Sequence, residues 1–172
     1  RFFTSAAAKS NHHDFQGGLA YHTLSMVRMA ESISDQYPQI NRALLLAGAC
    51  LHDFGKIIEL SGNLDIEYTF EGNMLGHITI VDEEIVKAAT DLDISLDSED
   101  MILLRHMILS HHGLLEYGSP ERPKLLEAEV LHNIDMMDAS INMITKALDK
   151  TENGKFSERV FGLDNRSFYK HS

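Results

Sequence analysis

The sequence has little of several features that mark particular classes of protein. Its single cysteine, Cys50, cannot form a disulfide framework, so a reducing cytoplasm is the expected compartment. No apolar run reaches the roughly 18 residues that span a bilayer, and no signal peptide is recognisable. Positive charge is scarce, with 15 Lys and Arg against 26 Asp and Glu. The net charge of -11 argues against a protein that coats nucleic acid, although bound divalent cations would invert the sign locally.

The 172 residues, 44% of them hydrophobic, are enough for one domain with a proper core. No internal repeat or boundary divides them, so we predict one all-α domain, a helical bundle, over residues 1–172. The spacing of apolar residues predicts helices at 19–36, 40–53, 75–90, 99–112 and 124–148. We expect an N-terminal arm at 1–16, a short extended excursion near 63–72 and a tail at 151–172 packed on the domain.

Three local details follow from the same patterns. Gly55 is expected to stop the helix that precedes it, and Asp97 is a candidate N-cap for the helix at 99–112. In the last predicted helix, the apolar line expected to be buried consists of Val130, Ile134, Met137, Ile141 and Ile144.

The stretch from Leu44 to Lys56 reads LLLAGACLHDFGK and organises the rest of the chain. It is an apolar helix that ends in His52 and Asp53. An unpaired ionised group buried there would cost several kcal/mol, so it needs a salt bridge or a metal ion. The rest of the chain favours the metal, because it supplies more nitrogen and carboxylate donors on separate predicted helices. These donors are His22, His77, His111, His112 and Asp135.

The donor set indicates which ions could bind. Imidazole and carboxylate without thiolate suit Mn, Fe, Zn, Co or Ni, and also Mg where water completes the shell. Neighbouring side chains leave a helix about 100° apart, so His52 and Asp53 can straddle a point at the helix end, where Asp53 could bridge two ions. There are more ligands than one ion needs. A two-metal site roughly 3.5–4 Å across would use them all, and such sites hydrolyse phosphoesters.

The order H…HD…H…HH…D resembles the HD-domain metal-dependent phosphohydrolases. The longer segments NHHDFQGGLAYHT, CLHDFGK, YTFEGNMLGHI, LSHHG and GLDNRSFYK resemble the bacterial 3′–5′ exoribonucleases of the YhaM type. The resemblance runs from Lys9 to the end of the chain. It does not extend to the HD-GYP cyclic-dinucleotide phosphodiesterases, because the run HHGLLEYGSPERP lacks the loop that defines that group.

The resemblance implies an HD-domain fold with two bound transition-metal ions, Mn or Fe before the others. It implies that His22, His52, Asp53 and Asp135 hold the first ion. It implies that Asp53 bridges to a second ion held by His77, His111 and His112. Asp53 and Lys56 would be the catalytic residues, with Lys56 meeting the substrate phosphate while the ions activate water. The substrate would be single-stranded RNA attacked from its 3′ end. The full-length protein would carry an OB-fold nucleic-acid-binding region, with this chain as the catalytic domain.

Alternatives stand beside this hypothesis. The chain could be an HD phosphohydrolase acting on mono- or oligonucleotides, or a non-catalytic HD module that senses a ligand or binds partners. His12, His13 and His132 are weaker candidates for substrate contact, and His132 is also a candidate for supporting a ligand. The basic residues after position 145 are interspersed with acidic ones. We therefore interpret them as a solvated surface in preference to a contact for the substrate strand. No feature of the sequence fixes an oligomeric state.

Overall fold

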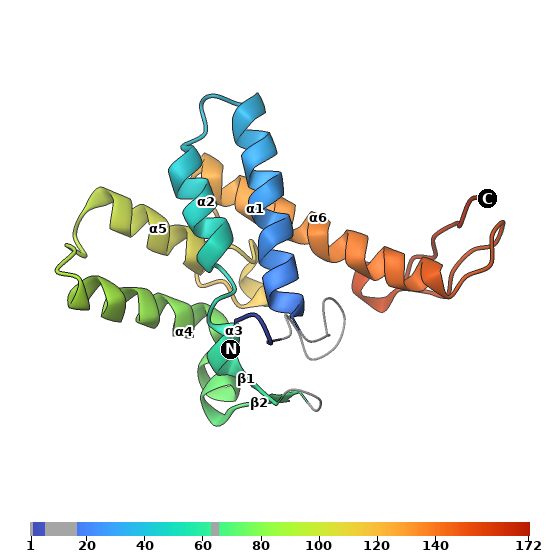
Figure 1. Ribbon diagram of the computed structural model, residues 1–172, viewed down its shortest axis with the longest axis horizontal. Coiled ribbons are helices and arrows are strands. Elements are labelled where there is room, and N and C mark those ends of the chain that lie inside the picture. Colours follow the sequence, from blue (N-terminus) through green and yellow to red (C-terminus); the bar gives the residue numbers. More distant parts are fainter. Residues whose placement is uncertain (1, 6–16, 63–65) are drawn as a thin grey trace.

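The computed structural model describes residues 2–5, 17–62 and 66–172, and this part of the chain is built mainly of helices (Figure 1). The elements in chain order are α1 (Gly18–Gln36), α2 (Arg42–Leu51), α3 (Lys56–Glu59), β1 (Leu60–Ser61), β2 (Glu67–Tyr68), α4 (Phe70–Asp91), α5 (Glu99–Ser110), the 3₁₀ turn η1 (Leu115–Tyr117), α6 (Leu126–Asp149) and the 3₁₀ turn η2 (Phe161–Leu163). The predicted all-α class is confirmed. Most of the predicted N-terminal arm lies outside the described residues.

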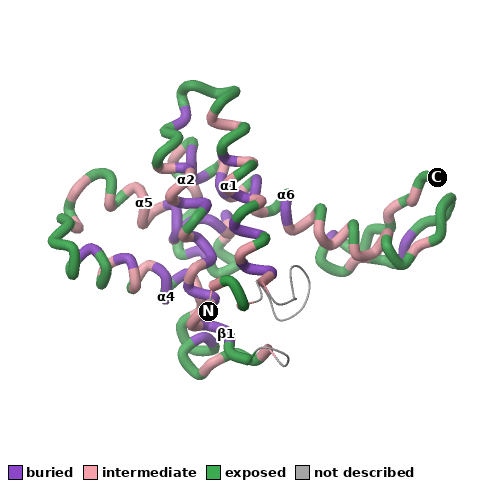
Figure 2. The backbone as a smooth tube through the Cα atoms, in the orientation of Figure 1, coloured by how far each residue is buried: buried purple, intermediate pink, exposed green. Residues whose placement is uncertain are grey.

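The main core lies where α1, α2, α5 and α6 meet, and the buried positions gather there (Figure 2). Met26, Leu45, Met107 and Leu131, one from each helix, are fully buried. A second cluster of Val81, Ile85 and Ile108 joins α4 to α5. None of the described helices is long and apolar enough to cross a membrane.

Polar side chains fix where three of the helices begin. Asn41 accepts a hydrogen bond from the amide of Leu44 at the start of α2, and Thr69 accepts one from Gly72 at the start of α4. Ser98 rather than Asp97 caps α5. The predicted cap is therefore wrong by one residue, because the extended backbone of Ser98 aims its hydroxyl at the first turn.

The predicted excursion near 63–72 contains the short strand β2, and its last residues, 70–72, belong to α4. β1 pairs antiparallel with β2, with Leu60 opposite Tyr68 and Ser61 opposite Glu67. α4 begins at Phe70, five residues before its predicted start, and the non-helical residue Gly76 (φ 72°) interrupts it. A second helical segment of α4 therefore begins at His77, directly after Gly76.

The second half of α6 projects away from the core, and the tail folds back at its end (Figure 1). The predicted buried line is wrong for this half, since Met137 and Ile141 are exposed. The buried residues of α6 are Glu127, Ala128, Leu131, Ile134 and Asp138. The tail contacts the last turn of α6, where the ammonium of Lys170 donates to the carbonyls of Leu148 and Thr151.

Candidate metal centre

The chain leaves α2 through a tight turn that carries His52 and Asp53. The amide of Phe54 donates to the carbonyl of Leu51 (2.9 Å) and that of Lys56 to Asp53 (3.0 Å). These i to i+3 bonds replace the wider α-helical pattern, so the predicted helix 40–53 ends at Leu51. The turn holds both side chains inside the molecule, where His52 is 0% and Asp53 3% exposed.

Gly55 has a different role from the one predicted. Its backbone is right-handed helical (φ −58°, ψ −20°), so it does not stop a helix through a left-handed conformation. A Cβ atom at this position would collide with the backbone oxygen of His77 and lie 3.1 Å from the amide nitrogen of Val81. Gly55 therefore makes the room that lets α4 pack against the turn.

A first group of donors gathers around His22, which α1 presents to the turn. Its Nε2 lies 3.2 Å from Nε2 of His52 and 3.5 Å from Oδ2 of Asp53. The same nitrogen lies 3.3 Å from Oδ1 of Asp135, which comes from α6. The structure thus brings together the four residues expected to hold the first ion.

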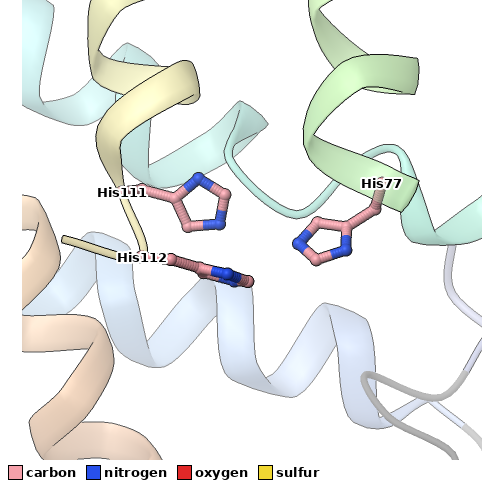
Figure 3. Close-up of side chains that lie close together, drawn as sticks. All are labelled: His77, His111 and His112. Carbon is pink, nitrogen blue, oxygen red and sulfur yellow. The ribbon is translucent and has the colours of Figure 1, made fainter. Parts of the chain in front are cut away.

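A second group consists of His77, His111 and His112, whose rings face one another across a small gap (Figure 3). His77 opens the part of α4 that follows Gly76, while His111 is the C-cap of α5 and His112 follows it. The ring centroids of His77 lie 5.7 Å from His111 and 5.1 Å from His112. The structure therefore also gathers the three histidines expected to hold the second ion.

Asp53 lies between the two groups and turns one oxygen to each. Its Oδ2 is 3.5 Å from Nε2 of His22 and 3.6 Å from Nε2 of His52. Its Oδ1 is 3.5 Å from Nε2 of His77 and 3.9 Å from Nε2 of His111. A carboxylate in this position can serve both groups at once.

Each of the five imidazoles is held by its outer nitrogen, Nδ1. The acceptors are Asp138 for His22 (2.7 Å), the Ala49 carbonyl for His52 (3.1 Å), Glu59 for His77 (3.2 Å), the Ile108 carbonyl for His111 (2.7 Å) and the Tyr117 carbonyl for His112 (2.7 Å). A ring nitrogen that donates its proton to an oxygen leaves the other nitrogen as the lone-pair donor. All five rings therefore offer Nε2 as their ligand atom.

The donor set fits divalent metal ions. Nε2 of His77 and Nε2 of His111 are buried and have no hydrogen-bond partner among the described residues. A buried polar atom without a partner costs free energy, so such atoms are rare in native proteins. A cation between the rings would satisfy both nitrogens.

Burial and charge set the protonation of the same groups. Burial lowers the pKa of His52 and, together with the imidazole of His112, holds that of His111 well below its usual value. Burial opposes the charged form of His22 as well, but hydrogen bonds with Asp135 and Asp138 raise its pKa to about 9. Against the effect of its own burial, Lys56 and nearby imidazoles hold the pKa of Asp53 well below its usual range.

Two carboxylates outside the expected ligand set support the histidines. Glu59 accepts from both the amide (3.1 Å) and the ring of His77, and Asp138 accepts from His22. Asp138 lies three residues beyond Asp135 on α6, and this i, i+3 spacing makes it the alternative to Asp135 as a ligand; the structure places it on the outer nitrogen of His22 instead. Glu59 carries no such signal, since its contact with His77 is set by how α3 meets α4.

Lys56 lies at the edge of the centre and is largely buried. Its ammonium donates to Oδ2 of Asp53 at 2.7 Å. It also lines a cavity of about 380 Å³ beside the histidines. The lining residues are Lys56, Glu59, Leu60, Tyr68, His77, His112, Tyr117, Asp135, Met136 and Ala139. Tyr68 and Tyr117 were not singled out from the sequence, and they bring two half-exposed aromatic rings to this cavity.

Of the weaker candidates, His132 is not among the residues that line this cavity. His132 donates from Nδ1 to the carbonyl of His111 (2.9 Å), so it contacts the backbone of a candidate ligand from outside. His12 and His13 lie outside the described residues.

The sequence model of the HD domain matches residues 19–140. The chain belongs to the HD-domain family. The matched segment contains every candidate ligand, from His22 in α1 to Asp135 in α6. The family and the clustered histidines and aspartates together indicate that the chain binds divalent metal.

The curated relatives of this HD-domain chain include proteins named 3′–5′ exoribonuclease YhaM. Those of Listeria welshimeri and Listeria monocytogenes are 56% identical over 168 residues, and that of Bacillus licheniformis is 55% identical over 169. Each alignment covers 98% of this chain and 53% of the relative, so the chain spans about half the length of these relatives. No solved structure shows significant similarity to the chain.

Proposed function

We propose that the chain is a metal-dependent phosphodiesterase that removes nucleotides from the 3′ end of single-stranded RNA, in the cytoplasm. The single observation that carries the hydrolytic part is that Nε2 atoms of four histidines lie within 3.9 Å of the Asp53 carboxylate, while the Nδ1 atoms of all five histidines are fixed from outside. The choice of RNA and of direction is supported by the names of the relatives, which match 98% of the chain.

In this proposal two divalent ions bind, and Mn and Fe are the preferred metals. His22, His52 and Asp135 would hold one ion, His77, His111 and His112 the other, and Asp53 both. Such a pair, when bound, lowers the pKa of water toward neutrality and stabilises charge on phosphate oxygens. Burial keeps His52 and His111 neutral, and only a neutral imidazole can donate a lone pair to an ion.

The residues around the cavity would position the substrate. Lys56 is the one cation among the cavity's lining residues, so we assign it to the phosphate of the terminal nucleotide. Tyr68 and Tyr117 offer ring faces at the same cavity, which suits stacking against a base. The cavity is large enough for one nucleotide-sized group, as expected for an enzyme that acts on a strand end.

The decisive experiment joins metal content to activity. Elemental analysis of the purified chain should give about two transition-metal ions per chain. A 5′-labelled RNA oligonucleotide should shorten in single-nucleotide steps, while free mononucleotides should be left unchanged. Turnover of mononucleotides in preference to RNA would instead support a nucleotide phosphohydrolase.

Asp53→Asn should separate catalysis from folding. The change removes the charge between the two groups, so at least one ion should be lost and turnover should fall at least roughly a hundredfold. Circular dichroism should show the helices retained. Wild-type turnover by this variant would contradict the proposal, and full metal content without any turnover in the unsubstituted chain would favour a binding module.

A further inference from the structure

The projecting half of α6 and the tail enclose a groove, separate from the metal centre, with a volume of about 360 Å³. The residues that line it are Met143, Lys146, Ala147, Lys150, Thr151, Glu158, Arg159, Val160, Phe161 and Gly162. Three of these are cations and one is an anion. The groove is therefore positively charged in a protein whose net charge is strongly negative.

The charge of this region differs from that of the rest of the chain. Residues 141–172 contain six Lys and Arg against four Asp and Glu, whereas residues 1–140 contain nine against 22. An acidic body of this kind repels a polyanion, so a cationic groove at one end is the place where a nucleic-acid strand would be attracted.

The structure assigns some of these six cations to structural contacts. Lys170 caps the end of α6, Lys155 pairs with Glu152, and Arg166 donates to the Leu163 carbonyl. Lys146, Lys150 and Arg159 line the groove. Lys150 and Arg159 are exposed and form no ion pair with any described residue.

An aromatic ring stands beside these cations. Phe161 lines the groove and is 86% exposed, more than any other large apolar side chain in the described part of the chain. Cations next to an exposed ring are the combination that single-stranded nucleic acid requires, because phosphates bind the charges and bases stack on the ring.

The groove and the metal centre are lined by the same face of α6. Asp135 and Ala139 line the active cavity, while Met143, Lys146 and Lys150 line the groove. At 100° per residue these five positions fall within about 80° of one another around the helix. From Asp135 to Lys146 the rise along the axis is roughly 16 Å.

We propose that this groove binds the body of the RNA strand whose 3′ end occupies the metal centre. The inference rests on the proposed function. Lys150 and Arg159 would bind phosphates, and Phe161 would stack on a base. The nearby apolar residues of α6, Met137 and Ile141, lie on the other side of the helix from Lys146, so a second copy of the chain seated there would leave the groove open.

Binding can be measured without hydrolysis. Fluorescence anisotropy of a labelled eight-nucleotide RNA in EDTA should show binding by the wild-type chain. For single strands the logarithm of affinity falls against the logarithm of salt concentration with a slope of about −0.7 for each neutralised phosphate. Lys150→Ala with Arg159→Ala should therefore make this slope shallower by about 1.4.

Matched controls separate the groove from net charge. Lys87→Ala with Lys124→Ala also removes two cations, and both lie outside the groove in ion pairs with Glu83, Glu84 and Glu121. This control should leave the salt slope unchanged. Phe161→Ala should weaken binding about thirtyfold, the middle of the range for one lost stacking contact, and Phe161→Tyr should retain wild-type binding.

Substrate length provides the second readout. The Lys150 and Arg159 double variant should raise KM for the eight-nucleotide RNA and leave hydrolysis of a dinucleotide unchanged, because a dinucleotide cannot reach the groove. An equal loss on both substrates would overturn the proposal.

The remaining outcomes distinguish this inference from the function it rests on. If the chain hydrolyses RNA and the double variant binds RNA as tightly as the wild type, the proposed function stands and the groove proposal is wrong. A change of oligomeric state in size-exclusion chromatography, without loss of RNA binding, would also overturn it and identify a contact between copies of the chain. RNA binding lost in the double variant of a chain that hydrolyses no phosphodiester would support the groove and reject the nuclease.

Discussion

At the scale of single residues, the outer contacts of the histidines decide what the inner ones can do. A ring fixed through Nδ1 has one tautomer and one orientation, so little reorganisation is needed before its Nε2 can bind an ion. Only His77 and His22 depend on side chains for this contact, through Glu59 and Asp138. The other three use backbone carbonyls.

Glu59→Gln tests the positioning role of Glu59. An amide accepts a weaker hydrogen bond from His77 than a carboxylate does, so metal affinity at the second group should fall roughly tenfold to a hundredfold. Titrating activity with Mn²⁺ should show a higher half-saturating concentration and nearly wild-type kcat at saturation. Glu71→Gln, which changes an exposed acid in α4, the helix that carries His77, is the matched control. A lower kcat that excess metal cannot restore would count against a positioning role.

His22 makes the stability of the metal-free chain depend on pH. Its folded pKa of about 9 is above the ordinary value of 6.5, so the charged form stabilises the fold. This contribution is complete below pH 6.5 and is lost as the pH rises through 9, by up to about 1.4 kcal/mol per pH unit. His52, His111 and His112 have lowered pKa values, so their contributions change below this window.

The measurement is thermal unfolding in EDTA between pH 6.5 and 9. The melting temperature should fall across this range in the wild-type chain and stay level in His22→Gln. An unchanged decline in His22→Gln would show that another group carries the pH dependence.

The sequence order of the candidate ligands was enough to predict which residues would meet. All seven, from His22 to Asp135, do lie together, as the resemblance to the HD-domain phosphohydrolases implied. Glu59 could not be predicted in the same way, since its contact depends on the approach of two helices that only the tertiary structure defines.

At the scale of elements, the close approach of α4 to the turn after α2 sets the distance between the two groups. Gly55→Ala should displace the backbone around His77, because the added methyl group meets main-chain atoms that cannot rotate away. We expect a loss of about 1–3 kcal/mol in the free energy of unfolding, with weaker metal binding.

Gly48→Ala is the comparison for this prediction. The methyl group there would meet the flexible end of Met107, and alanine favours a helix interior by about 1 kcal/mol. Denaturant unfolding of both variants should show the larger loss at Gly55. Equal stabilities would mean that this approach is not constrained.

The register of α6 shows why apolar periodicity failed in one helix. A line of apolar residues predicts the buried face when a helix lies wholly on the core, but the second half of α6 leaves it. A carboxylate, Asp138, takes a buried position because it holds His22. The demands of the site thus replaced hydrophobic burial at that position.

At the scale of the whole molecule, the metal centre joins segments that are far apart in the sequence. The donors come from α1, the turn after α2, α4, the end of α5 and α6. Ions bound there would act as cross-links between these elements and stabilise the folded state by mass action.

Removing the metal should therefore lower the melting temperature. When the free metal concentration is 100 times the dissociation constant of a site, binding adds about 2.7 kcal/mol to the free energy of unfolding. In a chain of this size, 1 kcal/mol corresponds to a change of roughly 2–4 °C in the melting temperature. Calorimetry should show a decrease of roughly 5–10 °C for each site emptied by EDTA. Asp53→Asn should respond less to EDTA than the wild-type chain, and an equal response would argue against metal bound at these residues.

The backbone acceptors of His52, His111 and His112 limit which inherited substitutions can remove a hydrogen bond from this site. A carbonyl group belongs to the main chain, so no codon change at Ala49, Ile108 or Tyr117 can delete it. Inherited variation can erase an outer acceptor only at Glu59 or Asp138. Those two carboxylates are where lineages that abandon the chemistry should first accumulate replacements while keeping the helices intact.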